Sequence, residues 1–313
     1  MKHLNLGPLC YEFSRHLEPR IEIDPGDTII VETEDAFSGQ IRTAEDRRDR
    51  NKIPQSNPQT GPIAIRGAQP GDALAITLRS IEPLIGQCAT RTGEARQLAE
   101  WLGPDCPHGT RICPIREGSI HWSDSVRIPY APMLGCLATA PAWGTPTTLL
   151  AGPYGGNLDI VEVAPRSIVF LPVFVPGALL YLGDAHAAMG HGELSGSGLE
   201  MPAATTLTVE VLSQFPLSWP RVETETEIMA IVSGTPQERS LAQAYVQLIL
   251  WLEADYGFDR WEAYDLLTHV GRVSVGWYAL GTVAAKVEKR YLRRPARNRP
   301  GGDSGQAVHS PMQ

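Results

Sequence analysis

Short apolar runs separated by Pro- and Gly-containing breaks make up the chain as far as about residue 220. Four of these runs cover residues 20–33, 63–81, 167–182 and 204–212. Runs of this length that are rich in β-branched residues and bounded by turn residues are typical of strands. The pattern therefore predicts an all-β body, built as a sandwich or a barrel-like structure.

Three of the predicted strands begin directly after a Pro-Gly dipeptide, at residues 25–26, 70–71 and 176–177. Pro-Gly favours a type II turn, because Pro fits the first central position and Gly takes the positive φ of the second. The shared opening is explained either by a repeated β unit or by the usual way in which hairpins begin. Strand ends are good platforms for a site, and the polar residues that follow these three strands are Glu34, Asp35, Glu82, Asp184 and His186.

After residue 233 the apolar positions change to three- and four-residue spacing, which predicts a helix. Thr235 is expected to be the N-cap, Pro236 the first helical residue and Glu238 the partner in a capping box. The helix should continue to about Ala254 with one buried stripe.

A second helix is predicted to start at Asp259, with Glu262 closing a capping box and Gly271 as the stop. The run over residues 273–287 fits either a final strand or a short helix, since its periodicity does not decide. The sequence thus predicts a mainly β protein with a β-rich body over residues 1–220 that carries the candidate site. A smaller α+β C-terminal lobe is expected over residues 221–293 and a disordered tail over residues 294–313.

Composition narrows the class of protein. The chain has 313 residues, 42% of them hydrophobic, which is enough for a full core. Its formal charge of -8 argues against a nucleic-acid partner, which would require a basic face. No segment approaches the ~20 apolar residues of a membrane span, and the first residues lack the apolar core of a signal peptide. We therefore expect a cytoplasmic protein without a membrane partner.

The five cysteines form an odd set without a Cys-x-x-Cys pair. Neither a disulfide framework nor a zinc ribbon is indicated. Cys106 and Cys113, with His108 between them, lie among Pro and Gly residues, and we interpret this stretch as a loop with incidental thiols.

Residues 183–200 carry the densest chemistry, with two histidines, three carboxylates and five glycines directly after an apolar strand. The glycines allow sharp turns and a close approach of the backbone to a ligand. Residues two apart on an extended strand point to the same side, so that Asp184 and His186 can converge on one cation.

Several other short motifs follow one another along the chain, at residues 57–62, 135–136 with 140–141, 155–159, and 171–173 with 175–179. Together with residues 183–200 they resemble the acetamidase/formamidase family of amide hydrolases. The resemblance covers most of residues 20–270 and implies hydrolysis of a small linear carboxylic amide. Met189 and His191 stand where the family commonly has Gln and Asp, and the region after Gly271 and residues 87–124 match poorly, so that the particular amide stays open.

The residues do not support a side-chain nucleophile. There is no Gly-x-Ser-x-Gly elbow, and Cys136 has no base beside it in the sequence. A divalent ion, by contrast, lowers the pKa of a bound water to roughly 7 and polarises the amide carbonyl. Zinc is favoured, with other divalent ions possible, and the expected ligands are Asp35, Asp184 and His186 with one position left for water.

Glu193 is the expected general base, since neighbouring glycines allow its loop to fold over the ion. Glu200 is its rival, or else a partner of His186 or a further ligand. His191 is expected to orient the substrate, to replace a carboxylate ligand or to be an exposed bystander. Asn157 and the backbone amides around Gly156 are candidate donors to the amide oxygen, although a turn-forming Asn fits equally well.

Two other functions remain open from the sequence. One is a catalytically silent, metal-stabilised or ligand-binding β protein, and the other is a hydrolase of a different C–N bond, in a cyclic or aryl-substituted amide. We also expect a homo-oligomer, for which the amphipathic helix over residues 236–254 offers an interface.

Overall fold

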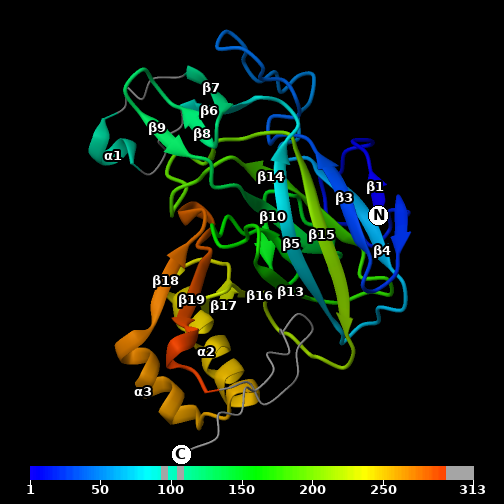
Figure 1. Cartoon of the computed structure of the whole chain (residues 1–313), viewed down its shortest axis with the longest axis vertical. Coiled ribbons are helices and arrows are strands. Elements are labelled where there is room, and N and C mark those ends of the chain that lie inside the picture. Colours follow the sequence, from blue (N-terminus) through cyan, green and yellow to red (C-terminus); the bar gives the residue numbers. More distant parts are fainter. Residues whose placement is uncertain (93–97, 104–108, 294–313) are drawn as a thin grey trace, which may run out of the picture.

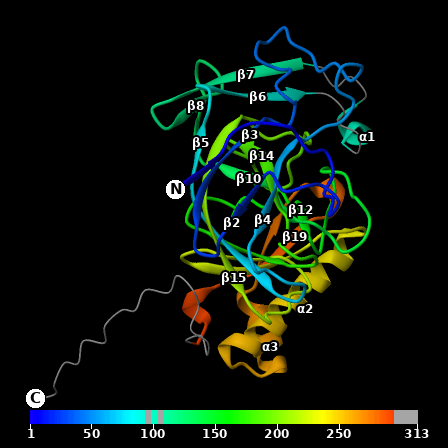
Figure 2. The same cartoon turned by 90° about the vertical axis from the view of Figure 1, so that its right-hand side faces the viewer.

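The computed structural model describes residues 1–92, 98–103 and 109–293. The predicted disordered tail over residues 294–313 lies outside the described residues, as do Cys106 and His108. Figure 1 shows a β body with two helices at one end, and Figure 2 shows that β6 to β8 lie at the opposite end of the molecule. The prediction of a mainly β fold with a small helical C-terminal region is confirmed.

The larger sheet has nine strands and forms one layer of a sandwich. Neighbouring strands are antiparallel except for the parallel pair β1 and β3. In spatial order the strands are β1 (Lys2–Leu4), β3 (Thr28–Thr33), β15 (Ala203–Leu212), β5 (Ala73–Pro83), β13 (Ile168–Pro172), β16 (Arg221–Glu223), β17 (Glu227–Val232), β19 (Val283–Glu288) and β18 (Arg272–Val275).

A six-stranded sheet forms the second layer. In spatial order its strands are β11 (Ala151–Gly152), β12 (Gly155–Asn157), β10 (Met133–Thr139), β14 (Leu180–His186), β4 (Gln59–Ile65) and β2 (Ile21–Ile23). Ile29 and Leu78 from the larger sheet share one buried core with Leu134 and Leu182 from this sheet. Burial on both sides explains why β14 and β10 read as continuous apolar runs in the sequence.

A four-stranded sheet begins in the stretch over residues 87–124 and ends just beyond it. It contains β6 (Gln87–Thr92), β7 (Gly109–Arg116), β8 (Ser119–His121) and β9 (Arg127–Pro129), and helix α1 (Ala99–Leu102) lies in the connection between β6 and β7. Cys113 lies in strand β7, so that the loop predicted around it is wrong, but it is buried opposite Cys88 on β6, which agrees with a structural role for its thiol.

Helix α2 (Gln237–Tyr256) packs on β17 and β19 through a second apolar core that includes Leu248, Trp251 and Ile228. Its predicted start is wrong. Pro236 occupies the N-cap position with extended backbone, which leaves Thr235 one residue too far out, and no side chain caps the helix. The helix ends two residues beyond Ala254, before Gly257 with φ 66°.

Helix α3 (Arg260–Val270) begins as predicted. The Asp259 side chain accepts hydrogen bonds from the backbone nitrogens of Trp261 and Glu262, the Glu262 side chain completes the capping box, and Gly271 is the C-cap.

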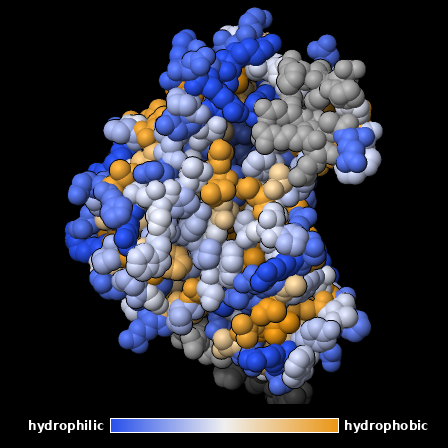
Figure 3. All heavy atoms as spheres, turned by 180° about the vertical axis from the view of Figure 1, so that it is seen from behind, coloured by the Kyte–Doolittle hydropathy of each residue, from blue (hydrophilic) through white to orange (hydrophobic). Residues whose placement is uncertain are grey.

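Apolar residues gather on the surface at the helical end, whereas the opposite end is hydrophilic (Figure 3). None of the helices among the described residues is long and apolar enough to cross a membrane.

Residues 272–288 form two strands, β18 and β19, joined by the short 3-10 helix η1 (Tyr278–Leu280), and η2 (Lys289–Tyr291) follows. The periodicity was ambiguous because β19 is almost completely buried. β16 to β19 extend the sheet that β13 also joins, so that strands from both sides of residue 220 share one sheet. The division into two domains at this residue stays a prediction.

The three Pro-Gly turns, before β3, before β5 and at residues 176–177, have the positive φ at Gly that a type II turn predicts. Gly26, Gly71 and Gly177 have φ values of 87°, 95° and 77°. A positive φ at the residue after Pro is what a type II turn requires, and Gly adopts it without steric cost.

Candidate active site

Strand β14 ends in the two residues that the sequence predicted to converge. Asp184 lies opposite Gly135 of β10. The strand pairing passes from Cys136↔Gly183 to Leu134↔Ala185 without a pair between them, and Asp184 has a φ of 58°. Asp184 Oδ1 lies 3.4 Å from His186 Nε2, and both side chains are buried. Asp184 and His186 therefore lie side by side as expected, and their role as metal ligands stays a prediction.

Glu200 approaches the same imidazole from the segment that precedes β15. It forms isolated bridges with His186 and Ala89. Its Oε2 lies 3.2 Å from His186 Nε2, while its Oε1 accepts hydrogen bonds from the backbone nitrogen of Gly198 at 3.0 Å and from Ser197 Oγ at 3.3 Å. Position 198 must be Gly because a Cβ there would lie 2.6 Å from His186 Nδ1.

Asp159 and Glu193 form a second group around His186, with one potential ligand atom from each residue within 4.8 Å of the others. Asp159 follows β12 and is fully buried. Glu193 lies in the loop after β14, is 8% exposed and has φ 43°. The backbone of this loop turns tightly here, since the Glu193 nitrogen donates to the Gly190 carbonyl oxygen and the Gly196 nitrogen to the Glu193 carbonyl oxygen.

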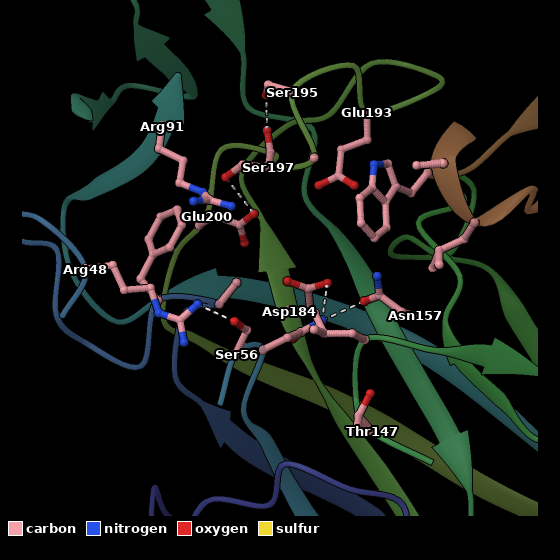
Figure 4. Close-up of a pocket in the computed structure, with 18 of the residues that line it drawn as sticks. Arg48, Ser56, Arg91, Thr147, Asn157, Asp184, Glu193, Ser195, Ser197 and Glu200 are labelled. Carbon is pink, nitrogen blue, oxygen red and sulfur yellow. Dashed lines mark hydrogen bonds between the residues drawn. The ribbon is translucent and has the colours of Figure 1, made fainter. Parts of the chain in front are cut away.

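A chain of side-chain amides holds the carboxylates in place. Gln59 Nε2 donates to Asn57 Oδ1 at 2.8 Å, and Asn57 Nδ2 donates to Asp184 Oδ2 at 3.0 Å and to Asn157 Oδ1 at 2.6 Å. Asn157 Nδ2 in turn donates to Asp159 Oδ2 at 2.9 Å. Figure 4 shows Asn157 and Asp184 joined in this way at the floor of a cavity. The orientations of Asp159 and Asp184 are therefore coupled.

The centre is strongly anionic. Burial and the charges of Glu193 and Asp184 raise the pKa of Asp159 well above its ordinary value, and burial raises the pKa of Glu193 to about 8 and also raises that of Glu200. Burial alone would lower the pKa of His186, but the charges of Glu200 and Asp184 outweigh it and raise the pKa. A bound cation would relieve the repulsion among these carboxylates.

The donor atoms fit a divalent ion. Among the described residues, His186 Nδ1, His186 Nε2, Glu200 Oε2 and Asp159 Oδ1 are buried without a hydrogen-bond partner. His186 Nε2 is thus within ion-pair distance of two carboxylates without forming a hydrogen bond, as expected for ligand atoms directed at a common point. Ligand atoms ~2.0–2.1 Å from a zinc ion at tetrahedral angles would be about 3.3–3.4 Å apart, which agrees with the separations of 3.4 and 3.2 Å.

A cavity of about 570 Å³ leads to this centre. Asp184, Glu193, Glu200 and Asn157 line its inner part, as Figure 4 shows. The remaining wall comes from segments far apart in the sequence, namely Tyr11, residues 36–57, Arg91 on β6, and residues 147–149, 194–197 and 277–280. The centre is therefore accessible to a small molecule.

Three of the predicted site residues lie elsewhere. Asp35 belongs to neither group around His186. It forms an ion pair with Arg42 and accepts hydrogen bonds from the backbone nitrogens of Phe37 and Gly39. His191 is exposed and Gly156 is buried in β12, and neither lines the cavity. Burial raises the pKa of the Cys136 thiol well above its ordinary value, which fits a structural residue.

The sequence reasoning gave no role to Asp159 or Asn57. Asp159 follows Asn157 at the same two-residue spacing that singled out Asp184 and His186, so that this spacing could have identified it. Asn57 opens the motif over residues 57–62, but the motif did not indicate which side chain it contacts, because the pairing of β14 with β4 brings Asn57 beside Asp184.

Fold and site together define a β protein with two large sheets packed on each other and a buried carboxylate and histidine centre at the base of a cavity. The chain belongs to the Acetamidase/Formamidase family, whose sequence profile matches residues 11–151 and 146–274.

Solved structures support this assignment. An acetamidase from Yersinia enterocolitica is 35% identical with a TM-score of 0.85, and the match covers 93% of this chain and 92% of that one. An acetamidase from Bacillus halodurans is 33% identical with a TM-score of 0.84 and coverages of 92% and 98%. The acetamidase of Mycolicibacterium smegmatis is 25% identical over 61% of this chain and 62% of its own length. The chain spans about 60% of the length of the curated relatives it matches.

Proposed function

We propose that this protein hydrolyses a small linear carboxylic amide, such as formamide or acetamide, to the carboxylate and ammonia by means of a metal-activated water. The observation that carries the proposal is the convergence of His186 Nε2 with the carboxylates of Asp184 and Glu200 at the base of the cavity. Family membership supports the reaction type.

Asp184, His186 and Glu200 would hold a divalent ion, with zinc favoured because one imidazole and two carboxylates suit it. Glu200 thereby takes the place that the sequence reasoning gave to Asp35, whose carboxylate is paired with Arg42. A bound ion would supply a water of lowered pKa, about 7, and a Lewis acid for the amide carbonyl.

Glu193 is the proposed general base. It lines the cavity and lies beside His186, but it is held by a loop rather than by an ion pair. Its carboxylate would accept a proton from the attacking water and pass it to the leaving nitrogen, because an amide leaves as ammonia only after protonation. Burial keeps its proton affinity higher than that of an exposed Glu, which favours this shuttle.

Asn157 is the proposed donor to the substrate. One N–H of its side-chain amide is used by Asp159, while an amide nitrogen carries two. The second N–H is available to the carbonyl oxygen of an amide in the cavity. The amide chain from Gln59 would fix this donor before the substrate binds, which is how hydrogen-bond donors contribute most to catalysis.

The test is ammonia release from formamide, acetamide and propionamide by protein loaded with Zn²⁺, with and without a chelator. We expect turnover of at least one of these amides and its loss on chelation. If metal-loaded protein releases no ammonia from any amide, the proposal is wrong and a silent ligand-binding protein becomes the better account. Turnover restricted to cyclic or aryl-substituted amides would instead favour the other hydrolase.

A cytoplasmic location and a homo-oligomeric state stay predictions. Val246 on α2 is half exposed, which leaves the helix able to take part in an interface. Light scattering on the purified protein tests the oligomeric state.

A further inference from the structure

The cavity is several times larger than formamide or acetamide requires. A water molecule occupies about 30 Å³ of liquid, so an amide with four non-hydrogen atoms needs on the order of 100 Å³. The cavity measures about 570 Å³. Cavities of this size commonly hold larger ligands with a few polar groups at fixed places. The rest of its wall therefore contains information about the substrate.

Three arginines line the same cavity: Arg48, Arg50 and Arg91. Among the residues that the structure describes, none of the three forms an ion pair with a carboxylate, although Asp184, Glu193 and Glu200 line the cavity too. Several other arginines of the described chain are paired, for instance Arg42 with Asp35 and Glu34, Arg66 with Glu22 and Asp24, and Arg272 with Glu227 and Glu288. The arginines of the cavity thus form a cationic part of the wall that is separate from the anionic centre.

Two of these arginines are directed inward. Figure 4 shows the side chains of Arg48 and Arg91 pointing into the cavity from different elements, Arg91 from β6 on the side of Glu200. Arg48 is fixed by hydrogen bonds to Ser56 Oγ and to the carbonyl oxygen of Gln55, while its buried Nε has no partner. The Arg91 side chain makes no hydrogen bond with the described residues.

The positive charges of Arg48, Arg50 and Arg91 repel one another. Burial and the charges of Arg50 and Arg91 lower the pKa of Arg48. Like charges held together in a half-buried wall destabilise the free protein and favour a bound anion. A carboxylate is the natural partner, because its two oxygens match the planar fork of a guanidinium.

We propose that the substrate is an amide that carries a carboxylate at its far end, that is, a monoamide of a short dicarboxylic acid, with Arg91 and Arg48 binding this carboxylate. This inference rests on the proposed function of the centre. Water adds to the amide carbon, the C–N bond breaks and both protons of the water are transferred to the leaving nitrogen, so that the products are the dicarboxylate and ammonium. Arg91 and Arg48 would then determine specificity, because they contact the substrate away from the reacting atoms.

The test compares kcat/KM for succinamate with kcat/KM for 4-methylpentanamide, in which an isopropyl group replaces the carboxylate. We expect metal-loaded protein to prefer succinamate at least tenfold, and Arg91→Gln to reduce this preference roughly ten- to hundredfold, which corresponds to the loss of a hydrogen bond to a charged group. Arg47→Gln is the matched control, since Arg47 is exposed and lies outside the cavity wall.

Equal use of the two amides by the unaltered protein, or an unchanged preference in Arg91→Gln, would overturn the inference while leaving the amidase proposal intact. If no amide of any kind is hydrolysed, the proposed function fails instead. Calorimetry with succinate then decides the role of the arginines. Succinate must bind the unaltered protein at least tenfold more tightly than the Arg91→Gln variant, and equal affinities would overturn the assignment.

Discussion

Gly135 leaves room for Asp184: a Cβ at position 135 would lie 2.5 Å from Asp184 Oδ2 and 2.6 Å from Asp159 Oδ1. A carboxylate from strand β14 and one from the segment after β12 therefore meet over a single glycine of β10. No larger residue fits without moving at least one of them, because real Cβ atoms do not approach other atoms this closely.

The first prediction concerns this contact. Gly135→Ala should displace Asp184 and Asp159 and lower zinc affinity about 10- to 100-fold, as for other residues that orient metal ligands. Titration with zinc against a competing chelator measures the effect. Gly86→Ala is the control, since a Cβ at that position meets nothing within 4 Å. Equal zinc affinities of the two variants would contradict the prediction.

The second prediction separates the base from the ligands. Glu193→Gln should retain bound zinc but lose about 10²- to 10⁴-fold in kcat, because a neutral amide cannot accept the proton. Elemental analysis and ammonia release on the same sample check both parts. Glu225→Gln, at an exposed position, serves as the control. A variant at position 193 that keeps its rate would exclude Glu193 as the base.

The third prediction follows from a buried cluster near the centre. Glu162 Oε1 accepts hydrogen bonds from Lys286 Nζ at 2.6 Å and from Ser274 Oγ at 2.5 Å, and so ties the segment after Asp159 to β18 and β19. Burial alone would raise the pKa of Glu162, but these hydrogen bonds lower it below its ordinary value. The ionised carboxylate therefore stabilises the folded protein above the unfolded pKa, about 4.3, and this contribution is lost as the pH falls through the folded pKa.

Glu162→Gln should accordingly lower the free energy of unfolding by about 1.5–3 kcal/mol at pH 7. The difference from the unaltered protein should shrink as the pH falls below about 4.3. Urea unfolding at both pH values measures it. Glu253→Gln removes an exposed ion pair with Arg260 and should cost at most about 1 kcal/mol. A difference at position 162 that grows toward low pH would contradict the assignment.

The fourth prediction distinguishes the two helix starts. Asp259→Ala should lower the free energy of unfolding by about 1 kcal/mol, since it removes the capping hydrogen bonds of α3. Thr235→Ala should cost less, because the Thr235 side chain does not cap α2. Thermal unfolding of both variants makes the comparison, and a larger loss from Thr235→Ala would show that the assignment of the α2 start is wrong.

The features predicted correctly depend on neighbours in the sequence. The turns at Gly26, Gly71 and Gly177 and the capping box at Asp259 are set within four residues. Asp184 and His186 are only two residues apart, although the positive φ of Asp184 departs from the regular strand that the sequence predicted. Local backbone preferences are strong enough to fix such features before any tertiary contact forms.

The rest of the site depends on tertiary contacts. Asp35 is a carboxylate at a strand end, which is why the sequence indicated it as a metal ligand. In the structure its side chain forms an ion pair with Arg42 instead. Glu200 and Asp159 come close to His186 only through the packing of separate segments. Arg48 lines the cavity from a loop and Arg91 from strand β6. Sequence spacing contains no information about these distances, which are set when the two large sheets close on each other.

The proposed zinc site is tested most directly by an anomalous difference map at the zinc edge, from crystals of protein grown with zinc chloride. We expect one strong peak bonded to His186 Nε2 and to carboxylate oxygens of Asp184 and Glu200, with a remaining position open to the cavity. A peak at Asp35 instead, or an active protein with no metal between Asp184, His186 and Glu200, would contradict it.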